Sequence, residues 1–286
     1  MALGWSRAHR AYTAGAYGLR FFFHSVLIDT HLHLDAVEFD PDRAALLARA
    51  RAVGIEGFVV PAVGREGFAR VLALAETTPG VFPALGIHPL TADRASEADL
   101  EALDILLAQG RAVAVGEIGL DHHVPGLDAA RQQAFFTAQL GLARRHDLPV
   151  ILHVRRAQDA VLAALRRTRV AGGIAHAFNG SFQQAEAFIG LGFKLGFGGA
   201  MTFDGSHRIR RLAAELPLEA IVIETDAPDM PPVWARGERN VPENLLRIAE
   251  VLAGLRGISL EEIIQITSDN ACTVLALPDN GRSRNL

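Results

Sequence analysis

Cysteine and lysine are almost absent from this chain of 286 residues, and their scarcity excludes several kinds of site. Cys272 is the only cysteine, which excludes an intramolecular disulfide and any cysteine-rich zinc module. It falls in a predicted C-terminal helix, where we expect a small buried hydrophobic residue. Lys194 is the only lysine, so arginine carries nearly all of the positive charge.

An excess of positive charge is also missing. The formal net charge is -4, and half of the residues are hydrophobic, as in a globular protein with a sizeable core. Proteins that coat nucleic acid non-specifically usually carry a basic field, so this class is disfavoured. An enzyme that takes nucleic-acid ends into a local pocket is not excluded.

Residues 1–25 lack acidic side chains and any apolar run long enough for a signal core or a membrane span. They contain Arg7, Arg10, Arg20 and the apolar triplet Phe21-Phe22-Phe23. We expect an N-terminal extension that is poorly ordered or that reflects a start site placed too far upstream. A domain at 26–278 and a polar tail at 279–286 would follow. We therefore expect a cytoplasmic monomer without a membrane partner.

Short apolar runs alternate with amphipathic stretches through the rest of the chain. This alternation predicts buried parallel strands joined by helices, and eight such units favour a single (β/α)8 barrel, a TIM barrel, of about 250 residues. One helix is expected at 129–146, and another begins at Asp40-Pro41, with aspartate as N-cap and proline first in the helix. The predicted strands are 26–31, 57–62, 81–87, 112–117, 149–153, 172–176, 193–198 and 221–226.

Six residues of metal-ligand type close five of these predicted strands, at the end where such barrels carry their chemistry. Taken singly, each has an ordinary explanation: a satisfied polar histidine, a carboxylate paired with arginine, or an aspartate that caps a turn. Their joint placement instead predicts a metal centre. The six are His31, His33, Glu117, His153, His176 and Asp226.

The spacing suggests how the ligands would share two ions. His31 and His33 are two apart on an extended strand and would face the same side, while His153 and His176 would approach together from the far side. Glu117 lies between the two groups and could bridge two ions. Two bridged divalent ions would activate a bound water and stabilise charge on a phosphoryl or acyl oxygen. The mixed ligand set leaves Mg, Mn and Zn open.

Several longer motifs strengthen this interpretation, and the chain resembles the TatD-type metal-dependent deoxyribonucleases, a branch of the amidohydrolase superfamily. The similarity runs from about Val26 to Leu277. It rests on Asp29-Thr30-His31-Leu32-His33-Leu34-Asp35, Gly86-Ile87-His88-Pro89, Gly116-Glu117-Ile118-Gly119-Leu120-Asp121, Pro149-Val150-Ile151-Leu152-His153, His176-Ala177-Phe178-Asn179-Gly180, Glu224-Thr225-Asp226-Ala227-Pro228 and Arg239-Asn240-Val241-Pro242.

The resemblance implies that the six residues ligate two metal ions and that Asp226 acts as general base or orients the attacking water. Many relatives carry Cys-Phe-Ser after the histidine of the sixth strand, whereas this chain has Ala177-Phe178-Asn179. In this segment the sequence is similar to that of the YjjV-like subgroup. It spares every ligand and concerns substrate preference.

Other polar residues are candidates for substrate contacts. His88 would face the same mouth and contact a phosphate or a leaving group. Arg155 and Arg239 would each bind a phosphate oxygen or pair with a carboxylate. Asp121 and His122 could support a ligand or contact the substrate. The glycines at 196, 198 and 199 do not form a dinucleotide fingerprint and indicate close backbone approach.

The sequence allows three functions to be compared. The first is a 3′-5′ exonuclease that releases nucleotides from short single-stranded DNA or RNA through a metal-bound hydroxide, with Asp226 and Glu117 as catalytic residues. The second is a deacylase or amide hydrolase, for example one acting on aminoacyl-tRNA. Cyclic-amide hydrolases that bridge their metals with a carboxylated lysine are disfavoured because Glu117 stands at that position. The third, a barrel that binds metal without turnover, would predict a lost ligand, and none is lost.

Overall fold

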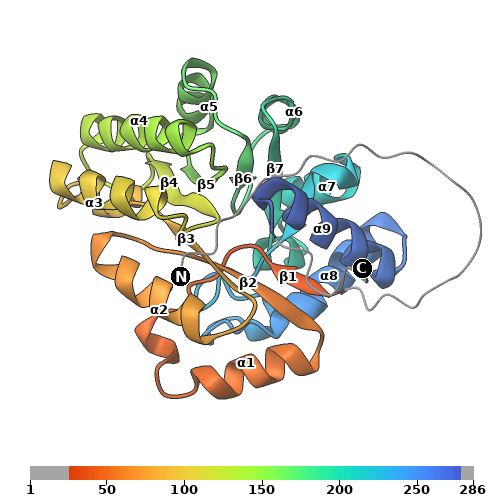
Figure 1. The fold of residues 1–286 in the computed structure, drawn as a ribbon. Coiled ribbons are helices and arrows are strands. Elements are labelled where there is room, and N and C mark those ends of the chain that lie inside the picture. The colour runs from red at the N-terminus through yellow and green to blue at the C-terminus, as the bar shows by residue number, and fades with distance from the viewer. Residues whose placement is uncertain (1–25, 278–286) are drawn as a thin grey trace, which may run out of the picture.

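Eight parallel strands form one sheet in the order β1 to β8, and helices cover its outside (Figure 1). The computed structural model describes residues 26–277, so the expected extension at 1–25 and the expected tail at 279–286 lie outside the described residues. The (β/α)8 barrel predicted from the alternating pattern is confirmed. The strands are β1 Leu27–Asp29, β2 Ile55–Pro61, β3 Val81–Leu85, β4 Ala114–Asp121, β5 Val150–Arg155, β6 Gly173–Ala175, β7 Phe193–Phe197 and β8 Ile221–Ile223.

One helix follows each strand, and an additional helix ends the described chain. The helices are α1 Arg43–Ala52, α2 Phe68–Thr77, α3 Glu97–Ala108, α4 Ala129–His146, α5 Gln158–Arg167, α6 Phe182–Gly190, α7 His207–Glu215, α8 Asn244–Arg256 and α9 Leu260–Leu275. Short 3-10 turns occupy Val37–Phe39, Arg65–Gly67, Pro89–Thr91, Gly199–Thr202, Leu218–Ala220 and Val233–Ala235. The prediction of a helix at 129–146 is confirmed, with Asp128 as its N-cap.

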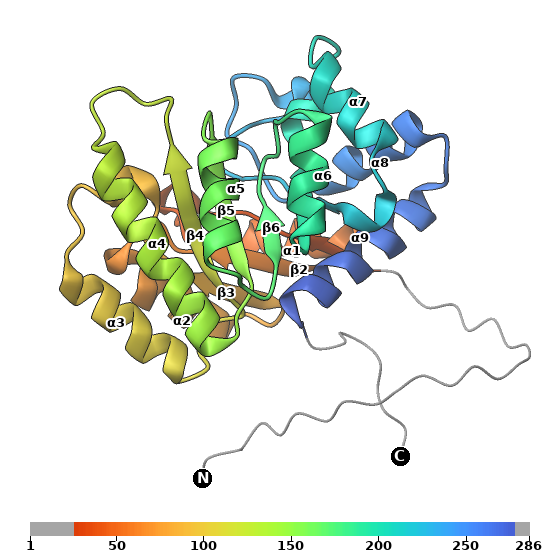
Figure 2. The same cartoon turned by 90° about the horizontal axis from the view of Figure 1, so that it is seen from above.

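The interior of the barrel is filled from its N-terminal end. A cluster of buried apolar residues takes one or two side chains from seven of the strands and adds Ala271 and Leu275 from α9. Helix α9 therefore packs beneath the barrel, next to β1 and β8 (Figure 2). Because this end is closed by apolar packing, the polar side chains of the strands gather at the opposite end.

The first and last strands meet at a seam made by side chains as well as by backbone. The Thr30 amide donates to the Ile223 carbonyl at 3.2 Å, and the Asp226 amide donates to the His31 carbonyl at 2.9 Å. The buried Asp29 carboxylate accepts from the Thr225 hydroxyl at 2.6 Å and from the Thr225 amide at 3.0 Å. These bonds close the barrel and bring the chemistry-bearing loops after β1 and β8 together.

Three local predictions were wrong. Helix α1 begins at Arg43 and not at Asp40-Pro41, because the Asp40 carboxylate binds the guanidinium groups of Arg43 and Arg70 and does not cap the helix. Strands β1 and β8 end at Asp29 and Ile223, before the ligands, because the backbone beyond them turns to form the seam. Cys272 is half-buried, packed at the edge of the lower apolar cluster.

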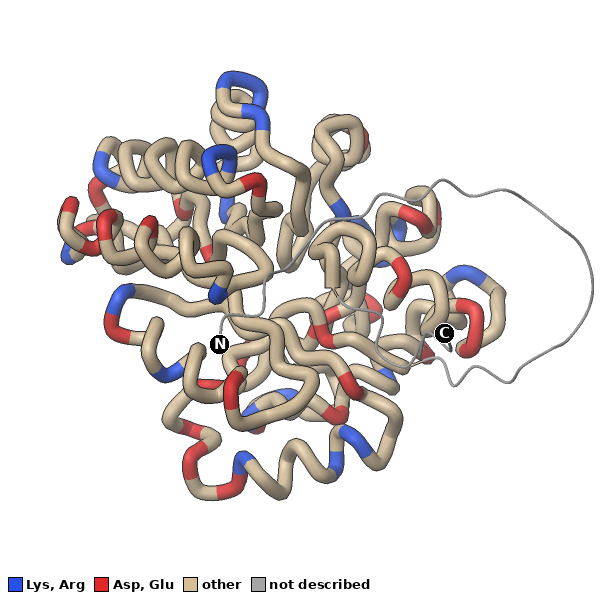
Figure 3. Tube along the Cα trace, in the orientation of Figure 1, with Lys and Arg blue, Asp and Glu red and all other residues tan. Residues whose placement is uncertain are grey.

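Among residues 26–277, no helix has the length and apolarity needed to cross a membrane. In the view of Figure 3, positions with positive and negative side chains are interspersed along the outer helices. This distribution agrees with the small net charge of the whole sequence.

Candidate metal centre

The six predicted ligands converge at the C-terminal end of the barrel, in three overlapping groups. The groups are His31 with Glu117 and His176, His31 with His33 and Asp226, and His88 with Glu117 and His153. Within each group one potential ligand atom from every residue lies within 4.8 Å of the others. His88, expected only as a substrate contact, therefore joins the cluster as a seventh member.

His31 is the most deeply buried member, with 0% of its side chain exposed. Its Nε2 lies 3.2 Å from Glu117 Oε2 and 3.6 Å from Asp226 Oδ1. Neither ring nitrogen has a hydrogen-bond partner. Burial and the neighbouring His176 lower its pKa, so the ring is neutral and can offer a lone pair.

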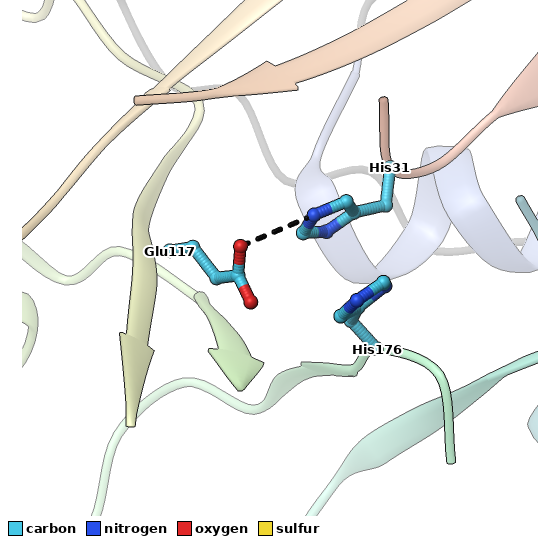
Figure 4. A group of neighbouring side chains, drawn as sticks. All are labelled: His31, Glu117 and His176. Carbon is cyan, nitrogen blue, oxygen red and sulfur yellow. Dashed lines mark ion pairs between the residues drawn. The ribbon is translucent and has the colours of Figure 1, made fainter. Parts of the chain in front are cut away.

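Glu117 lies in the middle of β4, not at its end as the sequence suggested, and β4 is buried along its whole length. Its carboxylate faces the rings of His31 and His176 in Figure 4. Burial opposes its ionisation, but the imidazoles around it, including that of His153 at 3.0 Å, hold its pKa well below the ordinary value. Glu117 is thus an ionised acceptor at the centre of the cluster.

His153 lies between two carboxylates. Its Nδ1 is 3.0 Å from Glu117 Oε1, and its Nε2 is 3.0 Å from Asp121 Oδ2. Asp121 is itself fixed, because its other oxygen accepts from the amides of His123 and Val124. A carboxylate that accepts from one ring nitrogen orients the other one as a metal ligand. Asp121 therefore positions His153, one of the two roles that the sequence left open.

His176 follows β6 directly, and its ring stacks on that of His31, with centroids 3.6 Å apart. It therefore groups with His31 and not with His153, contrary to the predicted pairing of the two distal histidines. On its other side, Glu224 Oε1 lies 3.0 Å from His176 Nδ1 and accepts the Ala177 amide at 2.6 Å. Burial opposes protonation of His176, but Glu224 and Asp226 raise its pKa.

Glu224 was not singled out from the sequence. It is 1% exposed, and its Oε2 has no hydrogen-bond partner. The glycine backbone of β7 makes room for it: a Cβ at Gly196 would lie 2.2 Å from that oxygen, which bears out the expectation of close backbone approach. The available signal was the acidic side chain that ends the apolar run of β8, since a buried carboxylate needs a partner.

Asp226 completes the cluster from the loop after β8. Its Oδ1 lies 3.6 Å from His31 Nε2 and 3.7 Å from His33 Nε2, and its Oδ2 lies 3.7 Å from His176 Nε2. Its backbone is in the left-handed region, with φ 58°, which aspartate tolerates better than most residues. That turn aims the carboxylate inward.

These residues fit divalent cations. The buried ring nitrogens of His31 and Nδ1 of His33 have no hydrogen-bond partner, and the carboxylates of Glu117 and Asp226 face these two rings. Buried polar atoms without partners are costly in a cluster held by hydrogen bonds alone, and a cation would satisfy them. Imidazole and carboxylate together suit several divalent transition metals.

The two predicted arginines lie outside the cluster. Arg155 ends β5 with its side chain 52% exposed, 3.9 Å from Asp121 Oδ2. Arg239 forms a two-pronged pair with Asp42 at 3.0 and 2.7 Å and lies over the Phe39 ring. Arg155 thus has a guanidinium at the rim, whereas Arg239 takes the carboxylate-pairing role.

Comparison with known proteins agrees with this site. A family model described as TatD related DNase matches residues 28–276. The chain is 43% identical over 254 residues to the uncharacterized metal-dependent hydrolase YjjV of Escherichia coli K12, which covers 88% of this chain and 98% of that protein. It is 32% identical over 258 residues to the putative deoxyribonuclease TATDN3 of Mus musculus, covering 86% of each.

A crystal structure of the E. coli YjjV protein, a TatD homologue, has the same fold. It superposes with a TM-score of 0.86 at 42% identity and covers 90% of this chain and 100% of that one. The family match covers most of the chain, and the barrel carries a cluster of histidines and carboxylates that could bind metal. The chain therefore belongs to the TatD family and is a metal-dependent hydrolase.

Proposed function

We propose that this protein is a phosphodiesterase that releases nucleotides from the 3′ ends of short single-stranded DNA or RNA, with two divalent ions. The observation that carries the proposal is the bridging position of Glu117. Its Oε2 is 3.2 Å from His31 Nε2, and its Oε1 is 3.0 Å from His153 Nδ1. One carboxylate thus serves two groups of ligands, as in two-metal phosphoryl-transfer sites.

The ions would be held by His31, His33, Glu117, His153, His176 and Asp226, with Glu117 between the His31 and His153 groups. When bound, such ions polarise a phosphoryl oxygen and lower the pKa of water. Mg, Mn and Zn are the candidates, since the ligand set mixes nitrogen and oxygen.

The chain's own residues would then place the substrate. Asp226, 13% exposed and aimed inward, would accept the proton of the attacking water. The exposed guanidinium of Arg155 at the rim would bind the phosphate of the neighbouring nucleotide. With a net charge of -4 and charges of both signs spread over the outside, affinity depends on this pocket, which favours short substrates.

The test is hydrolysis of a short 5′-labelled single-stranded DNA by metal-stripped protein, with Mg, Mn and Zn added back separately. Asp226→Asn is the inactive variant, and Asp204→Asn, at a carboxylate 99% exposed, is the matched control. We expect stepwise shortening from the 3′ end that needs metal and disappears only in Asp226→Asn. No cleavage by folded protein that binds two ions would overturn the proposal and favour the deacylase.

A further inference from the structure

His88 is held rigidly at the end of the β3 segment. Its amide donates to the Val63 carbonyl at 2.9 Å, and its carbonyl accepts the Thr91 amide and hydroxyl, each at 2.9 Å. The preceding Ile87 peptide is bound on both sides by the Gln139 side chain, at 2.7 and 3.0 Å. The imidazole is therefore presented to the cluster in one orientation, with 8% of the side chain exposed.

The backbone also decides which nitrogen of His88 carries the proton. Pro89 has no amide hydrogen, and the next amide, that of Leu90, donates to His88 Nδ1 at 3.1 Å. A nitrogen that accepts a hydrogen bond presents its lone pair, so the neutral ring has its proton on Nε2.

Nε2 points into the cluster with its hydrogen largely unused. Its nearest carboxylate oxygen is Glu117 Oε1 at 3.5 Å, beyond the usual 2.7–3.2 Å range of such bonds. The ring meets that of His153 edge to face, with centroids 4.4 Å apart. A donor aimed into a pocket of ligands is placed to meet an incoming oxygen.

The distances alone permit another role, since His88, Glu117 and His153 are close enough to share an ion. Ligation through Nε2 would need the lone pair there and the proton on Nδ1. A proton on Nδ1 would face the amide hydrogen of Leu90, so the hydrogen bond from that amide would be replaced by a repulsion between two donors. The cap of the short turn at Pro89–Thr91 therefore opposes a third ion at His88.

We propose that His88 is a catalytic residue that donates a hydrogen bond from Nε2 to a substrate oxygen on which negative charge develops, and that it is not a metal ligand. This inference rests on the proposed hydrolytic site but holds for a phosphoryl or an acyl oxygen alike. The proton stays on His88 throughout, so the role is charge stabilisation by a fixed donor.

Two variants distinguish the roles of the two ring nitrogens of His88. In His88→Asn the amide oxygen can still accept from Leu90, as asparagine does at helix N-caps, but no group reaches the Nε2 position. In His88→Gln the longer side chain returns an N–H donor to that position. Metal content per chain, measured by elemental analysis, and calorimetric binding of inorganic phosphate to the metal-loaded protein compare them with the wild type.

We expect all three proteins to hold the same number of ions, and His88→Asn to bind phosphate about 10- to 100-fold more weakly, as for loss of a bond to a charged group. His88→Gln should recover most of that loss. Nitrogen-15 spectra of the wild type should place the proton of His88 on Nε2. Loss of an ion in His88→Asn, unchanged phosphate binding, equal loss in both variants, or a proton on Nδ1 would each overturn the inference.

These measurements need no nuclease activity. If wild-type protein fails to cleave DNA, the proposed function fails while phosphate binding and metal content still decide the role of His88. If DNA is cleaved, kcat/KM of His88→Asn should fall about 100- to 1,000-fold, as when one donor is removed from an oxyanion site.

Discussion

The contact between β7 and Glu224 allows a small perturbation with a calculable effect. A Cβ at Gly196 would lie 2.2 Å from Glu224 Oε2 and 2.7 Å from Cδ. Because non-bonded atoms settle about 3.5 Å apart, Gly196→Ala should push the carboxylate away by about 1 Å. The backbone at Gly196 is outside the left-handed region, so alanine itself is not strained there.

The displaced carboxylate would leave His176, whose Nδ1 now lies 3.0 Å from Glu224 Oε1. Losing a carboxylate that orients a ligating histidine weakens metal affinity about 10- to 100-fold, or about 1.4–2.7 kcal/mol. The added methyl group also overpacks a buried space, which costs about 1–3 kcal/mol of unfolding free energy. Gly196→Ala should therefore lower both quantities.

Calorimetric titration of metal-stripped protein with Mn or Zn measures the affinity, and urea unfolding measures the stability. Gly141→Ala in α4, where a Cβ meets no atom within 4 Å, is the matched control. It should gain about 0.5–1 kcal/mol of stability and keep its metal affinity. Glu224→Gln should weaken binding similarly, and adding Gly196→Ala to it should have little further effect. Wild-type metal affinity in a destabilised Gly196→Ala would refute the role of Glu224.

Three further predictions concern other parts of the molecule. Gln139→Ala leaves both polar groups of the buried Ile87 peptide without partners and should cost about 2–4 kcal/mol in urea unfolding; a change below 0.5 kcal/mol would contradict it. The hydrogen bond from Arg239 holds the pKa of Asp42 below 3.8, so the pair stabilises the fold above that pH and the contribution is lost as pH falls through the lowered pKa. Asp42→Asn should therefore flatten the decline of the urea midpoint as the pH falls below about 4, and an unchanged profile would count against the pair. Chelation of metal should lower the melting temperature by about 5–10 °C relative to protein at 100 times the dissociation constant, since ions bind only the folded cluster; a His31→Asn variant should show no such shift.

The fold and the clustering of the six histidine and carboxylate side chains were accessible from the sequence, because they depend on periodic apolar runs and on residue types at their ends. The pairing of His31 with His176 was not, since it depends on how far the loop after β1 turns toward β8, and an apolar run carries no information on that turn. Residue spacing likewise says nothing of which nitrogen of His88 is protonated, because a single backbone amide, that of Leu90, decides it.

Glu224 and Arg239 show two ways in which the sequence alone fails to indicate the role of a residue. Glu224 stands in a sequence motif that suggested no role for it. In the fold, the glycine backbone of β7 leaves space for its carboxylate beside His176. Arg239 belongs to a motif that resembles the family's. Both of its terminal nitrogens nevertheless donate to the carboxylate of Asp42, which is distant in the sequence. In both cases the deciding partner is distant along the chain and only the folded backbone brings it near.

The seam between β1 and β8 determines when the metal centre can assemble during synthesis of the chain. Asp29 and Thr225 are 196 positions apart, and the Asp226 carboxylate joins His31 and His33 only once the last strand has docked. A chain still emerging from the ribosome has both histidines but lacks the acid, so it cannot assemble a competent centre. We therefore expect hydrolytic activity to begin only with the finished barrel.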